Sequence, residues 1–188
     1  MFALIPQAII HVIIMWVINM ENKKDLPKRK EPRLKGFDYS QTGAYFLTIC
    51  TQNRKNILSE IVGEGFSLPR LSPYGVIVDK WIQYIPEKYS NVFVDCYVIM
   101  PNHIHILLSI VNDGGRENPS PTADVVIGWL KYQSTKEINE LRGGTCDKIF
   151  QRSFFDHIVR NRDDYNEIYK YIYENPICWY SDKLYAEE

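Results

Sequence analysis

The sequence is poor in cysteine, and the spacing of its cysteines excludes several classes of protein. Only four cysteines occur in 188 residues, they lie far apart, and no C-x-x-C pair is present. This argues against a zinc cage and against a disulfide framework, and it predicts reduced thiols in a cytoplasmic protein. The sequence also lacks a P-loop, a glycine-rich dinucleotide fingerprint and a G-x-S-x-G elbow. Nucleotide-hydrolysing enzymes and serine hydrolases of those kinds are therefore excluded.

Length and composition predict one globular domain with an extension at its N-terminal side. With 45% hydrophobic residues the chain is too apolar to be disordered. It is also too short for an eight-fold β/α barrel, which takes about 250 residues. We place the predicted domain at residues 37–188.

The formal net charge of -1 conceals an uneven distribution of charge. Residues 1–20 contain no lysine, arginine, aspartate or glutamate, whereas residues 23–35 carry seven lysines and arginines against Asp25 and Glu31. We define residues 21–36 as the basic arm. Such an arm suits a polyanion, either a nucleic acid or an anionic membrane surface, and the alternative is a solvated lead-in with no partner.

The apolar residues 1–20 have two explanations. Their length is close to the roughly 20 residues that span a bilayer. However, they are interrupted by Pro6, Gln7, His11 and Asn19, and no positive region precedes them as in a signal peptide. We favour a translation start at Met20 over a membrane anchor, and expect a membrane partner only if residues 1–20 are translated and inserted. If residues 1–20 span a membrane, the basic arm that follows would hold the domain in the cytoplasm. In either case we expect a cytoplasmic domain.

The remaining pattern predicts an α+β fold. Strands are expected at 44–51, 92–100 and 103–111, the last two joined by a hairpin at Pro101-Asn102. Helices are expected at 72–89 with a kink at Pro86, at 122–141 with a stop at Gly143-Gly144, and at 162–174. With a further strand in the uncertain segment up to residue 159, this order is that of a ferredoxin-like βαββαβ antiparallel sheet followed by a C-terminal helix.

Helical spacing of apolar side chains predicts which face of each helix is buried. The expected stripes are Val76, Val78, Trp81, Ile82 and Ile85 in the first helix, Val125, Val126, Trp129 and Leu130 in the second, and Tyr165, Ile168, Tyr169 and Ile172 in the last.

Two histidines stand together in the most informative stretch, residues 100–108. On a strand, His103 and His105 project to one face and Ile104 and Ile106 to the other. Two imidazoles on one face can bind a single divalent metal ion. The alternative is a pair of histidines on a solvated face of the sheet.

In the last helix, Tyr171 and Asn175 fall outside the apolar stripe. They are one turn apart and share a face. A phenol beside an amide, whose oxygen can bind a metal ion, is a candidate site. The alternative is that both side chains face water.

Four stretches carry a resemblance to a known family. They are residues 36–54 (GFDYSQTGAYFLTICTQNR), residues 100–105 (MPNHIH), residues 150–157 (FQRSFFDH) with Arg160-Asn161, and residues 171–176 (YIYENP). In this order they resemble the HUH-class single-strand tyrosine transposases, specifically the REP-associated tyrosine transposases. The resemblance covers most of residues 33–180, and residues 1–20 lie outside it.

The resemblance implies roles for individual residues. His103 and His105 match the family's paired metal ligands, Asn175 matches the third ligand through its side-chain oxygen, and Tyr171 matches the nucleophile. The implied cofactor is Mg²⁺ or Mn²⁺, and the implied reaction is a metal-dependent endonuclease and strand-transfer reaction through a 5′-phosphotyrosine intermediate. Where relatives often have tyrosine, this chain has Phe154-Phe155, so no second nucleophile competes there.

The implied substrate is single-stranded DNA with a hairpin beside the cleavage site. Basic side chains at six positions are candidate phosphate contacts: Lys28, Arg29, Lys30, Lys131, Arg152 and Arg160. Tyr39, Tyr45 and Trp129 are candidates either for base stacking or, more in keeping with their positions, for the core. The resemblance is compatible with a monomer or a homodimer, and implies no protein partner.

Three other functions remain alternatives. A domesticated hairpin-binding protein that does not cleave DNA is disfavoured because His103, His105, Tyr171 and Asn175 are all present. A related HUH nuclease that initiates replication often carries a helicase domain, for which the chain has no length. An unrelated H-x-H metalloenzyme needs further ligands, for which His157 is the only loose candidate.

Overall fold

The computed structural model describes residues 42–62, 69–111 and 121–185. Its sheet has four strands: β1 (Gly43–Cys50), β4 (Val92–Ile99), β5 (His103–Ile110) and β6 (Phe155–Ile158). They lie in the order β4-β5-β1-β6, and every neighbouring pair is antiparallel. This order confirms the predicted ferredoxin-like arrangement and assigns the fourth strand to the segment that the sequence left uncertain.

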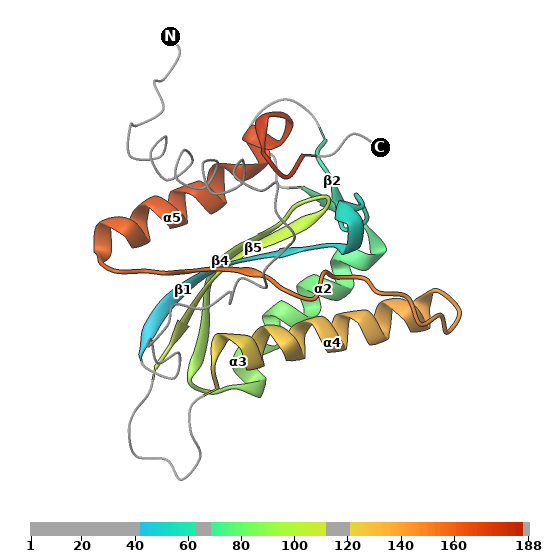
Figure 1. Cartoon of the computed structure of the whole chain (residues 1–188), viewed down its shortest axis with the longest axis horizontal. Helices are drawn as coiled ribbons and strands as arrows, with labels where there is room; N and C mark the ends of the chain where they lie inside the picture. The colour runs from blue at the N-terminus through green and yellow to red at the C-terminus, as the bar shows by residue number, and fades with distance from the viewer. Residues whose placement is uncertain (1–41, 63–68, 112–120, 186–188) are drawn as a thin grey trace, which may run out of the picture. The chain divides into compact units, whose positions relative to one another are not determined.

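Helices cover both faces of the sheet (Figure 1). Helices α2 (Pro73–Gln83), α3 (Ile85–Lys88) and α4 (Ala123–Leu141) lie against one face, and α5 (Arg162–Glu174) lies across the other. The first face packs Leu47 and Ile106 against Val78 and Leu130. The second face packs Leu107 against Ile168 and Ile172 of α5. Seven of the eight residues of β5 are therefore buried, because neither face of that strand reaches water.

Local sequence signals account for the ends of the helices. The side chains of Ser72, Thr122 and Asn161 accept hydrogen bonds from backbone N–H groups of the first turns of α2, α4 and α5. Gly143 and Gly144, with φ of 85° and 84°, end α4 because glycine adopts this left-handed conformation without strain. Tyr84 interrupts the first predicted helix, and α3 begins there with Pro86 in its first turn, which confirms the predicted kink.

Three predicted core positions are wrong. Val76 and Val125 are 55% and 52% exposed, and Tyr169 is 46% exposed. Each lies beside the buried stripe of its helix, where the neighbouring elements decide what is covered. Gly75 and Ile77 are buried in α2 instead, and Ala123 and Ile127 in α4.

Short elements that the sequence did not predict complete the fold. A two-stranded ladder joins β2 (Ser59–Glu60) to β3 (Arg70–Leu71), and a 3₁₀ turn, η1 (Gln52–Arg54), follows β1. A longer 3₁₀ segment, η2 (Asn175–Ser181), continues α5. Within the described ranges no helix combines the length and hydrophobicity needed to cross a bilayer, and residues 1–20 lie outside those ranges.

Candidate active site

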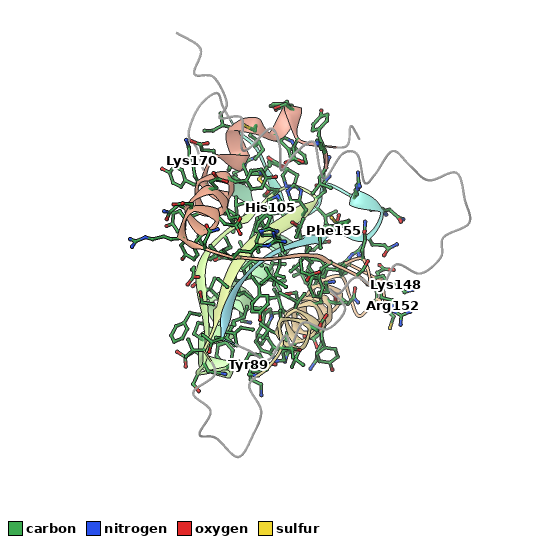
Figure 2. All side chains as sticks on the ribbon, turned by 60° about the vertical axis from the view of Figure 1, so that its left-hand side comes forward. Tyr89, His105, Lys148, Arg152, Phe155 and Lys170 are labelled. Atoms are coloured by element: carbon green, nitrogen blue, oxygen red, sulfur yellow. The ribbon has the colours of Figure 1, made fainter. Side chains whose placement is uncertain are left out.

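The two predicted histidines lie side by side between the sheet and α5. His103 and His105 are 0% and 3% exposed, and their Nε2 atoms are 3.1 Å apart. Figure 2 shows His105 in this interior position. The face of the sheet that carries them is therefore not solvated, and the alternative of two solvent-exposed histidines is wrong. Burying two polar imidazoles costs free energy, so their burial needs an explanation.

Hydrogen bonds on the far side of each ring fix this arrangement. His103 Nδ1 lies 2.8 Å from Asn102 Oδ1, and the Asn102 amide nitrogen donates to the Leu184 carbonyl. Oδ1 is therefore the acceptor, His103 Nδ1 is the donor, and the lone pair of His103 Nε2 points into the site. His105 Nδ1 is 2.9 Å from Thr48 Oγ1, directly across the strand pair.

Burial keeps both imidazoles neutral. It lowers the pKa of His103 well below its usual range, an effect strengthened by the neighbouring His105 and Arg54, and it lowers the pKa of His105 to about 3. Neutral imidazole is the form that binds metal ions. The two Nε2 atoms are 3.1 Å apart, so both imidazoles could bind the same ion.

Tyr171 of α5 brings a phenol to the same point. Its hydroxyl lies 3.4 Å from His105 Nε2, and its ring meets the rings of His105 and Phe46 at centroid distances of 5.2 and 5.9 Å. Burial, followed by the negative charge of Asp182, raises the pKa of Tyr171 above its ordinary value. The phenol is thus held protonated beside the histidines.

Asn175, one turn after Tyr171, completes the predicted set. It is 2% exposed, which contradicts the alternative in which it faces water. Its amide nitrogen donates to Asp182 Oδ2 at 3.2 Å, whereas its Oδ1 accepts no hydrogen bond of normal length and angle from the described residues, although the Asn175 side chain interacts with His103. A buried, unpaired amide oxygen beside two imidazoles is a donor set that fits a divalent cation, since the oxygen otherwise bears an uncompensated desolvation cost.

The structure adds Asp182, which sequence analysis missed. Donor atoms of His103, His105 and Asp182 all lie within 4.8 Å of one another. Asp182 directly follows η2 as its C-terminal cap, and the irregular turn there has no periodicity from which the direction of its side chain could be predicted.

Arg54 is a second residue that sequence analysis did not assign to the site. Burial raises the pKa of Cys50, and the positive charge of Arg54 opposes that rise; burial lowers the pKa of His103, and Arg54 adds to that lowering. Asn53 and Arg54 both adopt left-handed backbone conformations, with φ of 57° and 54°. Left-handed non-glycine residues are strained and cluster at functional sites, so this turn is a candidate phosphate-binding element.

The other predicted basic contacts have different surroundings. The Lys131 ammonium donates to the carbonyls of Gln151, Arg152 and Ser153, and burial lowers the pKa of Lys131 to about 8. Arg152 and Arg160 are exposed. Lys28, Arg29 and Lys30 lie outside the described residues, as does Tyr39.

The remaining candidates belong elsewhere. His157 pairs with Asp164 at 3.0 Å and, within the part of the chain described, is not a member of the His103 cluster. Tyr45 is fully buried, and Trp129 packs against Trp81 at a ring-centroid distance of 5.6 Å. These positions confirm the expectation that both aromatic residues belong to the core.

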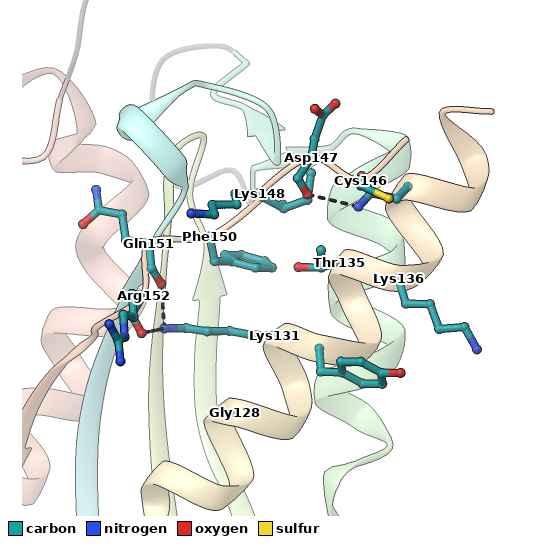
Figure 3. Close-up of a pocket in the computed structure, with 13 residues that line it drawn as sticks. Gly128, Lys131, Thr135, Lys136, Cys146, Asp147, Lys148, Phe150, Gln151 and Arg152 are labelled. Carbon is teal, nitrogen blue, oxygen red and sulfur yellow. Dashed lines mark hydrogen bonds between the residues drawn. The ribbon is translucent and has the colours of Figure 1, made fainter. Parts of the chain in front are cut away.

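A basic groove of about 520 Å³ lies between α4 and the segment of residues 146–152, which leads to β6 (Figure 3). We define it by its four cations, Lys131, Lys136, Lys148 and Arg152, together with Tyr132. Tyr132 is 66% exposed. Lys131 is turned toward the chain backbone in this groove.

Comparison with known proteins identifies the family. No family model matches the chain. An uncharacterised protein of Haemophilus influenzae is 30% identical over 172 residues, which are 85% of this chain and 94% of that protein. A candidate REP-associated tyrosine transposase of H. influenzae is 28% identical, over 74% of this chain and 73% of the relative. The REP-associated tyrosine transposase of Escherichia coli is 23% identical, over 74% of this chain and 69% of the relative.

The fold agrees with these relatives. The solved structure of a REP-associated tyrosine transposase bound to a REP hairpin matches with a TM-score of 0.50 and 19% identity, over 77% of this chain and 73% of that chain. The sequence relatives define a transposase, and the sheet with its covering helices has the matching fold. The chain belongs to the family of REP-associated tyrosine transposases.

Proposed function

We propose that the protein cleaves and rejoins single-stranded DNA beside a hairpin, through a covalent link between Tyr171 and a 5′-phosphate. The observation that carries this proposal is the Tyr171 hydroxyl 3.4 Å from His105, beside two neutral imidazoles and the unpaired oxygen of Asn175. This proximity supports the roles proposed for Tyr171 as nucleophile and for the other three side chains as metal ligands. The relative bound to a REP hairpin supports hairpin DNA as the substrate.

His103, His105 and Asn175 would hold Mg²⁺ or Mn²⁺. When bound, such an ion polarises the scissile phosphate and offsets the charge that develops on its oxygens. A mixed set of imidazole nitrogen and amide oxygen suits Mn²⁺ and Mg²⁺ with water in the remaining positions. The residues on the far side of the rings, Asn102 and Thr48, keep both Nε2 atoms directed into the site.

Tyr171 supplies the nucleophile. Its oxygen bonds to phosphorus while the phenol gives up its proton, and the bond from phosphorus to the 3′ oxygen breaks so that this oxygen leaves and takes up a proton. Reversal by a 3′-hydroxyl from another strand end rejoins DNA. The energy of the phosphodiester is kept in the tyrosine link, so no ATP is required.

The DNA contacts form a second part of the proposal. Exposed Arg152 and Arg160, and Arg54 beside His103, are proposed to bind phosphates near the cleavage site. The basic groove extends this surface with Lys136 and Lys148, and Lys131 supports its wall. The basic arm, including Lys28, Arg29 and Lys30, is proposed to bind DNA beyond the hairpin.

The test is covalent capture. The purified protein is incubated with labelled single-stranded hairpin DNA and Mn²⁺ and run on denaturing gels, beside Tyr171→Phe and His103→Ala. Tyr173→Phe is the matched control, since Tyr173 lies on the same helix but is 66% exposed. We expect an adduct in the wild type and the control only. Tight hairpin binding without an adduct under any metal would instead support the domesticated binding protein.

A further inference from the structure

We propose that Asp182 is a fourth protein ligand of the metal ion, so that the centre is built from two imidazoles, one amide and one carboxylate. This inference rests on the metal-dependent function proposed above. It is carried by the convergence of Asp182 with His103 and His105, whose donor atoms lie within 4.8 Å of one another.

The charge balance of the site favours such a group. Imidazole binds a metal ion in its neutral form, and the Asn175 amide carries no charge, so these three side chains alone would leave a bound dication without a compensating charge. Burying an unpaired charge is costly. The Asp182 carboxylate is partly buried and is held beside the histidines. As a ligand it would supply the negative charge that the other three side chains lack.

A hydrogen-bond chain fixes the position of this carboxylate. The Leu184 backbone N–H donates to Asp182 Oδ1 at 2.6 Å, and the Leu184 carbonyl accepts from the Asn102 amide at 2.7 Å. Asn102 also orients His103 through its Oδ1. One buried residue therefore positions a histidine ligand and the turn that carries Asp182, as expected of groups that support a metal centre.

The second carboxylate oxygen is held toward Asn175. Oδ2 accepts from the Asn175 amide nitrogen at 3.2 Å, and this contact turns the unpaired Oδ1 of Asn175 away from Asp182. Each of the two side chains thereby keeps an oxygen lone pair for the centre. Two hard oxygen donors beside two imidazoles favour Mn²⁺ or Mg²⁺ over soft metals.

The experiment measures metal binding without DNA. Isothermal titration of the full chain with Mn²⁺ alone gives Kd for the wild type, Asp182→Asn, Asp182→Cys and His103→Ala. The Asn variant retains an oxygen for the Leu184 N–H but removes the charge. We expect it to weaken Mn²⁺ binding by about 10- to 100-fold, the range seen when groups around a metal centre are removed. Asp163→Asn is the matched control, since Asp163 is exposed in the first turn of α5.

A change of metal preference separates ligation from a structural role. In Asp182→Cys we expect weaker Mn²⁺ binding and tighter Cd²⁺ binding than in the wild type, because a thiolate prefers the softer ion. A turn that merely supports the fold gives no gain with Cd²⁺, and Asp163→Cys controls for a thiol elsewhere on the surface. Circular dichroism of the metal-free variants checks that they are folded.

The outcomes distinguish this inference from the proposed function. If His103→Ala abolishes Mn²⁺ binding while both Asp182 variants bind both ions like the wild type, the carboxylate is not a ligand and the metal-dependent function stands. If the wild type binds no Mn²⁺, the metal-dependent function and this inference both fall.

Discussion

The unpaired side-chain oxygen of Asn175 destabilises the metal-free protein. A buried acceptor without a partner destabilises a fold by about 1–3 kcal/mol, and Asn175 Oδ1 is buried without one among the described residues. The amide nitrogen recovers part of this cost by donating to Asp182. A residue chosen for stability at this position would be apolar, so the amide itself argues for a ligand.

Asn175→Leu tests this at the scale of one residue. The substitution removes the unpaired acceptor and the hydrogen bond to Asp182 together, so we expect the free energy of unfolding without metal to change by less than about 1 kcal/mol. The stabilisation by Mn²⁺ should be lost. Thermal melts with and without Mn²⁺ measure both quantities. A metal-induced rise in Tm equal to that of the wild type would show that Asn175 is not a ligand.

Sequence reasoning worked best where single residues carried an unambiguous signal. His103 and His105 are two residues apart, so they must share a face of any strand. Tyr171 and Asn175 are four residues apart, so they must share a face of any helix. The resemblance then gave these residues their roles. Asp182 carried no such signal, because its direction is set by the Leu184 and Asn102 hydrogen bonds across the fold.

At the scale of elements, the close approach of α2 to the chain after η1 depends on Gly75. A Cβ placed there would lie 2.0 Å from the Leu58 carbonyl oxygen, which belongs to the backbone and cannot swing away. The boundaries of α2, α4 and α5 could be predicted from their caps. This contact could not, since it joins residues distant in sequence.

Paired glycine substitutions test this packing. We expect Gly75→Ala to destabilise the protein by about 1–3 kcal/mol through overpacking. Gly128→Ala in α4 is the matched control, because a Cβ there meets nothing within 4 Å. It should stabilise by about 0.5–1 kcal/mol through helix propensity. Urea denaturation gives both values, and equal effects of the two changes would refute the role assigned to Gly75.

The stability contributed by the contact between β4 and α2 depends on pH. The Tyr97 hydroxyl donates to Asp79 at 2.6 Å, and burial together with this bond raises the pKa of Tyr97 to about 12. Between the ordinary pKa of about 10 and this value, the unfolded chain has lost the phenol proton while the folded chain keeps it. Stability from this group is therefore full below pH 10 and is lost as pH rises toward 12.

Tyr97→Phe removes that contribution. We expect the variant to be less stable than the wild type by about 1–2 kcal/mol at pH 7, and the difference to shrink above pH 10. Urea denaturation from pH 7 to 11 gives the two curves. Tyr132→Phe, at a position 66% exposed, should follow the wild type throughout. A constant difference between Tyr97→Phe and wild type would mean that packing alone is responsible.

At the scale of the molecule, α5 is the element that turns a common sheet into a site. Without it, one face of the ferredoxin-like sheet would carry two solvated histidines. With it, both histidines are buried, which lowers their pKa values, and the Tyr171 phenol lies beside them. Asn175, at the start of η2, directly follows α5. The order of elements was predictable from periodicity and turn residues, but the depth of the site depends on how α5 and η2 pack, which periodicity does not specify.

Because one chain supplies Tyr171, both histidines, Asn175 and Asp182, we predict that a single copy assembles the whole site. Tyr171→Phe and His103→Ala proteins, mixed in equal amounts, should then form no adduct with hairpin DNA and Mn²⁺ beyond that of each alone. A site shared across a homodimer would instead recover adduct in the mixture, because one partner retains the tyrosine and the other the histidines. Wild type mixed with His103→Ala controls for inhibition by the inactive chain. Sedimentation of the protein–DNA complex, measured on the same samples, gives the number of chains per hairpin and should return one.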